Sequence, residues 1–264
     1  MIPAGIKSRF IARRHTVLLA ALVITFSVRP LIGDAGNGPV FFSIAMLALM
    51  LVALYTIQID EMLDERQVPL AERRRRSIIG WGLAVPAILD RLVVIFLPSH
   101  SLYMAGTIIW FLLFAFITWN ELRGVLRQKE ISGETISLSV SIYLLIGFTW
   151  GLFYIVLHEV QPDAFNLGTL ASSNSAATSE QHVFPILLYF SLITLSTVGY
   201  GDILPLTLQA RYAAAAEGIA GQFYLAILVA RLVGIYMSRS VNQDTSDQAR
   251  TIETKSAAVG TNDP

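Results

Sequence analysis

Apolar residues along the chain gather into six long stretches that are separated by short polar segments. A helix needs about 20 mostly apolar residues to cross the hydrocarbon core of a membrane, and these stretches have or nearly have that length. We therefore predict an all-α, multi-pass membrane protein with six transmembrane helices. The predicted spans cover residues 16–32, 39–59, 78–97, 101–119, 135–157 and 207–236.

A shorter apolar stretch lies between the fifth and sixth predicted spans. It runs from Pro185 to Ser196 and is too short to cross a membrane. Its length fits a helix that enters the membrane and turns back. Pro185 is well placed for the first helical turn, where a missing amide hydrogen costs nothing.

The composition agrees with a membrane protein and disfavours the soluble classes. Hydrophobic residues make up 54% of the chain and charged residues 14%, with a mean hydropathy of +0.60, whereas an ordinary globular chain carries about 25% charged residues. The net charge is zero, which gives no basic field for nucleic acid. The sequence contains no cysteine and no recognisable catalytic motif. We therefore expect no enzyme, nucleic-acid partner, soluble substrate or cofactor.

Segments rich in cationic residues alternate along the chain with loops that contain almost none. The cationic residues gather in the N-terminal tail and in the loops after the second and fourth spans, and the positive-inside rule places such segments in the cytoplasm. We therefore predict a plasma (inner) membrane protein with both termini cytoplasmic. The residues concerned are Lys7, Arg9, Arg13, Arg14, Arg66, Arg73 to Arg76, Arg123, Arg127 and Lys129.

The first predicted span has an alternative interpretation. Basic residues followed by a short apolar run also describe a signal peptide, so residues 1–35 can act either as a cleaved signal or as a first transmembrane helix. The second span enters from the same outer side in either case.

The short helix is followed by the hexapeptide Thr-Val-Gly-Tyr-Gly-Asp at residues 197–202. Non-helical backbone at membrane depth is tolerated where it lines water or is buried in protein. Gly199 and Gly201 reach backbone conformations that residues with a Cβ atom adopt at a cost. With a short helix before it and a long apolar span after it, this segment resembles the selectivity filter of potassium channels.

The resemblance implies a function and a set of site residues. Filter carbonyl groups replace the water shell of a permeating ion, so the carbonyls of residues 197–200 and the Thr197 hydroxyl are expected to bind K⁺. One chain holds one loop, which implies a homotetramer in membrane lipid that conducts K⁺ passively. A less selective cation channel and a non-conducting regulatory subunit remain alternatives. The implied filter residues are Thr197, Val198, Gly199, Tyr200 and Gly201, supported by Asp202 and Tyr189.

The six-span layout also resembles bacterial channels of the voltage-gated architecture. It implies a cytoplasmic tail (1–15), a four-helix voltage-sensor-like domain (16–119), a cytoplasmic linker (120–134), a pore domain (135–236) and a disordered tail (237–264). A voltage sensor carries arginines on its fourth span, whereas residues 101–119 contain no arginine or lysine. Strong voltage gating is therefore not expected.

A few charges and glycines within the spans are further candidates. Ionisable residues inside a membrane are costly and are functional candidates by default, although each can also be a structural contact. Two glycines on the sixth span can serve as a gating hinge or as sites of close helix packing. The charges are Asp90, Arg91, Glu217 and Arg231, and the glycines are Gly218 and Gly221.

Overall fold

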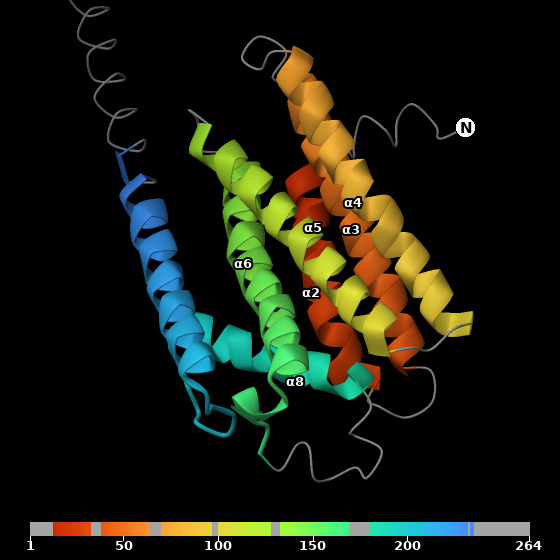
Figure 1. Cartoon of the computed structure of the whole chain (residues 1–264). Coiled ribbons are helices and arrows are strands. Elements are labelled where there is room, and N and C mark those ends of the chain that lie inside the picture. Colours follow the sequence, from red (N-terminus) through yellow and green to blue (C-terminus); the bar gives the residue numbers. More distant parts are fainter. Residues whose placement is uncertain are drawn as a thin grey trace, which may run out of the picture.

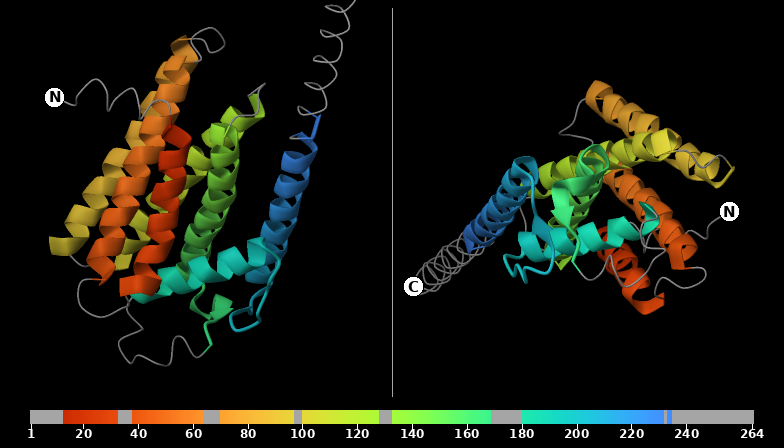
Figure 2. Two further views of the ribbon diagram at one scale, coloured as in Figure 1. Left: turned by 180° about the vertical axis from the view of Figure 1, so that it is seen from behind. Right: turned by 60° about the horizontal axis from the view of Figure 1, so that its bottom comes forward.

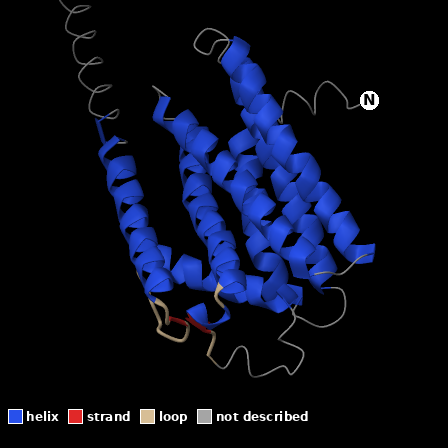
Figure 3. Ribbon diagram, viewed as in Figure 1, coloured by secondary structure: helices blue, strands red, loops and turns tan. Residues whose placement is uncertain are grey.

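The computed structural model describes residues 13–32, 38–63, 70–96, 100–127, 133–168, 180–231 and 233–234. Helices make up nearly all of this part (Figure 3). The long ones are α2 (Arg14–Ile32), α3 (Gly38–Leu63), α4 (Leu70–Phe96), α5 (His100–Arg127), α6 (Gly133–Val160) and a C-terminal helix (Leu208–Arg231). The shorter elements are η1 (Pro162–Ala164), β1 (Phe165–Asn166), α8 (Glu180–Leu195) and β2 (Leu204–Pro205).

The long helices run side by side, and α8 crosses one end of the assembly at a steep angle (Figure 1). Helix α6 is central, because it packs against α5, α2 and α8. The C-terminal helix stands beside α6 on the side away from α2 to α4 (Figure 2). An aromatic cluster joins these elements, with the Phe148 ring of α6 contacting Phe114 of α5 and Phe184 of α8.

Five of the described helices are long and apolar enough to cross a membrane. They are Arg14–Ile32, Val40–Ile59, His100–Leu126, Gly133–Val160 and Leu208–Arg231. These coincide with five of the six predicted spans, and the prediction of an all-α, multi-pass membrane protein is confirmed. The third predicted span lies on α4, which is a continuous helix but not one of the five. A total of six spans therefore stays a prediction.

Two boundaries differ from the sequence-based expectation. Helix α8 begins at Glu180, so Pro185 lies inside the helix rather than in its first turn. The polar residues before the proline concealed this start, because they do not extend the apolar run. Helix α5 continues to Arg127, so the first half of the predicted linker 120–134 extends the preceding helix.

The N-terminus of α2 is fixed to the start of α6 by one carboxylate. Glu134 accepts a hydrogen bond from the His15 backbone amide at 3.0 Å and another from the Thr16 hydroxyl at 2.5 Å. A negative charge at a helix N-terminus also interacts favourably with the helix dipole. This contact attaches the first helix to the region predicted to form the pore domain.

Some predictions fall outside the described residues. These are residues 1–12 of the predicted N-terminal tail, which also begin the signal-peptide alternative, the whole predicted C-terminal tail (237–264), and the side chain of Arg91.

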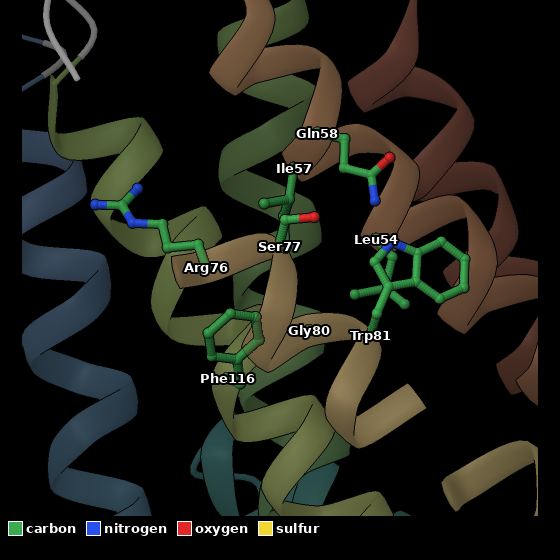
Figure 4. Close-up of a pocket in the computed structure, with 8 residues that line it drawn as sticks. All are labelled: Leu54, Ile57, Gln58, Arg76, Ser77, Gly80, Trp81 and Phe116. Carbon is green, nitrogen blue, oxygen red and sulfur yellow. The ribbon is translucent and has the colours of Figure 1, made fainter. Parts of the chain in front are cut away.

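A small cavity lies between α3, α4 and α5 (Figure 4). Its volume is about 10 Å³, which is room for one water molecule at most. We therefore assign it no ligand. Its walls are formed by Leu54, Ile57, Gln58, Arg76, Ser77, Gly80, Trp81 and Phe116.

The contact between Asp90 and Gly106 gives a stability prediction. A Cβ atom added at Gly106 would lie 2.2 Å from an oxygen of the Asp90 carboxylate, which packs against α5 at this point. Gly106→Ala should therefore displace the Asp90 carboxylate and lower the free energy of unfolding by about 1 kcal/mol, the low end for overpacking because the end of a side chain moves more easily than backbone, measured as thermal unfolding in detergent.

Gly124 on the same helix provides the matched control, because a Cβ atom there meets nothing within 4 Å. Gly124→Ala should leave stability unchanged or raise it slightly. Equal unfolding midpoints for the two variants would contradict the proposed close approach.

Candidate functional site

The hexapeptide 197–202 begins at the C-terminus of α8 with a defined capping pattern. The Val198 amide donates to the Ile193 carbonyl at 2.9 Å, and the Thr197 amide donates to the Thr194 carbonyl at 3.0 Å. These two bonds form a Schellman motif, which satisfies carbonyls that the end of a helix leaves unpaired. The Gly199 amide also donates to Ile193, at 3.1 Å. The helix therefore holds the first three residues of the loop.

Every second residue of the loop has a positive φ. The values are 60° at Thr197, 52° at Gly199 and 77° at Gly201. The two glycines were expected to adopt such conformations, because they lack a Cβ atom. Thr197 was not, since a positive φ is a genuine outlier for a β-branched residue and costs about 1–3 kcal/mol. The backbone of Thr197 is therefore strained, and strain of this kind gathers at functional sites.

The far end of the loop is attached to α8 and to the segment after α6. The Tyr189 hydroxyl of α8 donates to Asp202 Oδ2 at 2.9 Å. Strand β1 pairs antiparallel with β2, and the Leu206 amide donates to the Ala164 carbonyl at 2.8 Å. Gly168 has a φ of 63°, and a Cβ atom there would lie 2.5 Å from the Asp202 carbonyl oxygen. We call this arrangement of residues 162–168 and 202–206 the outer clamp.

The loop and the C-terminal helix present a large exposed surface in the single chain. Residues 196–202 are all exposed, and the Tyr200 side chain reaches 73% exposure. In the C-terminal helix, only 17% of the most apolar window is buried. Lipid or further protein chains must cover so much apolar surface. The exposed apolar residues of this helix include Leu208, Tyr212, Ile219, Phe223, Ile227 and Val229.

Glu217 is fully buried behind the loop, where three elements meet. It accepts a hydrogen bond from Tyr154 of α6 at 2.5 Å and contacts Ser191 of α8. The partners of Glu217 therefore lie on both α6 and α8. Ser191 and Tyr154 were missed, and the signal for Ser191 was a small polar residue within an otherwise apolar helix.

The remaining candidates divide between the loop region and distant positions. A Cβ atom at Gly221 would lie 2.7 Å from the Leu195 carbonyl, so Gly221 permits close packing against α8. Gly218 is more open, with the Thr194 carbonyl at 3.9 Å from such an atom.

Asp90 lies against α5 at Gly106, away from the loop. Arg231 donates to the Val125 carbonyl of α5.

Arg231 belongs to a second contact region near the end of α5. Val125 packs in a small cluster with residues of α6 and with Tyr224 of the C-terminal helix. The Tyr224 hydroxyl donates to the Ser139 carbonyl of α6 at 2.6 Å. Arg231 therefore attaches the end of the C-terminal helix to α5 instead of joining the loop.

Comparison with known proteins places the loop within a recognised domain. A protein-family profile described as "Ion channel" matches residues 139–238, which include most of α6, α8, the loop and the C-terminal helix. The chain is similar to "Protein LctB" of Bacillus caldotenax, with 30% identity over 109 residues. The aligned part covers 41% of this chain and 78% of that protein. No solved structure is significantly similar to the chain.

The outer clamp gives a prediction for Gly168. Gly168→Ala introduces a Cβ atom against the Asp202 carbonyl and forces a strained backbone. The variant should expose the Leu206 amide to hydrogen exchange faster than in the wild type, by about tenfold or more for a loss of about 1.4 kcal/mol in local stability.

Gly133→Ala serves as the control, because the site at the start of α6 is open. An unchanged exchange rate at Leu206 in Gly168→Ala would contradict the role of Gly168 in the outer clamp.

Proposed function

The chain belongs to the ion channel family that matches residues 139–238, and from that premise we propose that it is a potassium-selective channel. The observation that carries the proposal is the Thr-Val-Gly-Tyr-Gly-Asp loop together with its anchorage on α8. In this proposal K⁺ moves passively down its gradient, and neither a cofactor nor a chemical reaction is involved.

The proposed ion ligands are backbone oxygens of the loop. The carbonyls of residues 197–200, with the Thr197 hydroxyl, replace the water shell of K⁺. The positive φ values at Thr197, Gly199 and Gly201 support this, because they interrupt the alternation of carbonyl directions that an extended strand would have. The C-terminal end of the α8 dipole is negative and favours a cation nearby.

The proposed pore contains four copies of the chain. A single chain supplies one loop and so one wall of a coordination site. The exposure of residues 196–202 and of the apolar C-terminal helix supports assembly, since both surfaces need a cover in the membrane. Tyr189 and Asp202 would then fix the position of each loop at the outer mouth.

We further propose that helices α2 to α5 form a voltage-sensor-like domain without gating charges, next to a pore domain over residues 135–236. Residues 101–119 contain no arginine or lysine, so little charge would move in the field. The bond from Arg231 to Val125 supports a mechanical link between the C-terminal helix and α5. The proposed location is the plasma membrane, with both termini in the cytoplasm.

Recordings of purified protein in planar bilayers test this function. Under opposed K⁺ and Na⁺ gradients the reversal potential should lie near the K⁺ equilibrium value, and the open probability should change little with voltage. Gly199→Ala should abolish the current, because residue 199 needs a positive φ.

Gly133→Ala is the matched control and should conduct like the wild type, because its site is open. Equal permeability to K⁺ and Na⁺ would assign the protein to the less selective cation channels. Absence of current from verified tetramers would favour the non-conducting regulatory subunit.

A further inference from the structure

Glu217 forms the centre of a continuous hydrogen-bonded path behind the loop. The Tyr154 hydroxyl of α6 donates to Glu217 Oε2 at 2.5 Å. The other carboxyl oxygen, Oε1, is in hydrogen-bond contact with the Ser191 hydroxyl of α8. Ser191 Oγ also lies 2.7 Å from the Gly147 carbonyl oxygen of α6. The path therefore connects the C-terminal helix with both α8 and α6.

The number of hydrogens in this path determines the protonation state of Glu217. A serine hydroxyl has one hydrogen, whereas a backbone carbonyl and an ionised carboxylate can only accept. Ser191 has two such neighbours, Gly147 O and Glu217 Oε1, and can donate to one of them. The Tyr154 hydrogen is already directed at Oε2. A second hydrogen at Ser191 must therefore come from Glu217 itself.

The surroundings of Glu217 are also unfavourable for a negative charge. The side chain is fully buried, and the titratable groups that interact with it are Tyr154 and Tyr143, both on α6. In the described part of the chain, its contacts from α8 come from the Ser191 hydroxyl, and no arginine, lysine or histidine pairs with it. A buried carboxylate without a cation is costly, whereas a hydrogen-bonded neutral acid is not.

We propose that Glu217 is a neutral carboxylic acid that positions α8 and, through α8, the selectivity filter. Its proton is donated to Ser191 Oγ, and the Ser191 hydrogen is donated to the Gly147 carbonyl. Ser191 lies two residues before Ile193, whose carbonyl anchors the amides of Val198 and Gly199. Glu217 is therefore a positioning residue for ion selectivity, and this consequence rests on the proposed function.

Loss of the proton would break the path at its centre. Two acceptors would then face the single Ser191 hydrogen, and a buried charge would lie between three helices. Either change pushes α8 away from the C-terminal helix and alters the spacing of the carbonyls at residues 197–200. Selectivity for K⁺ should therefore be retained at neutral pH and decline as the pH rises far enough to ionise Glu217.

Three substitutions distinguish the effect of the Glu217 proton from the effect of side-chain volume. Glu217→Gln keeps an acceptor toward Tyr154 and a donor toward Ser191, so it mimics the neutral acid. Glu217→Leu removes both functions at a similar volume. Ser191→Ala removes the link to α8 with little change in size. Size-exclusion chromatography shows first that each variant assembles like the wild type.

Infrared difference spectroscopy between neutral and strongly alkaline pH detects the protonated carboxyl group of Glu217 directly. The wild type should lose the carbonyl stretch of a protonated carboxylic acid on alkalinisation. This signal should be absent from Glu217→Gln, and it should shift in Ser191→Ala because the acid loses its acceptor. The absence of this signal from the wild type, or its persistence in Glu217→Gln, would contradict the proposal that Glu217 is protonated.

Bilayer recordings then test the positioning role. The ratio of K⁺ to Na⁺ permeability should fall by about tenfold in Glu217→Leu and Ser191→Ala, the size expected for losing one buried hydrogen bond. Glu217→Gln should keep the wild-type ratio and keep it at alkaline pH. An unchanged ratio in both Glu217→Leu and Ser191→Ala, or a loss in Glu217→Gln as large as in Glu217→Leu, would overturn the inference. A wild type without selectivity would instead contradict the proposed function, while the infrared result would still stand.

Discussion

The hydrogen bonds from residues 197–199 to the end of α8 are the constraint on which the site depends. Irregular backbone needs hydrogen-bond partners from the protein wherever water cannot reach it, and the end of α8 supplies such partners to the loop. The Ile193 carbonyl accepts from Val198 and Gly199, and the Thr194 carbonyl accepts from Thr197. The strained backbone of Thr197 makes this geometry possible, and packing against α6 keeps α8 in place.

Three sets of contacts hold α8 and the loop together. Tyr189 and Asp202 join the helix to the far end of the loop, while β1 and β2 attach that end to the segment after α6. Glu217 and Ser191 join α8 to the C-terminal helix from behind. A displacement of α8 therefore reaches the loop at both ends, and in the proposed channel a residue remote from the ion path would influence selectivity in this way.

Much of this arrangement could be predicted from the sequence, and the rest depends on contacts between distant residues. Helix length and apolarity predicted five helices that can cross a membrane, and the hexapeptide predicted the loop and the positive φ of Gly199 and Gly201. The strain at Thr197 could not be predicted, because it arises from the capping of α8. The pairing of β1 with β2 was equally hidden, since each strand has two residues and no periodicity.

The proposed channel requires an arrangement in which four loops meet around one axis and bind K⁺ through their carbonyls. Electron cryo-microscopy of the purified protein in K⁺ tests it most directly. We expect a fourfold assembly with a row of densities on the axis, level with residues 197–200, and a Glu217 side chain in contact with Ser191. Loops that stay apart, or an axis without density at that level, would contradict it.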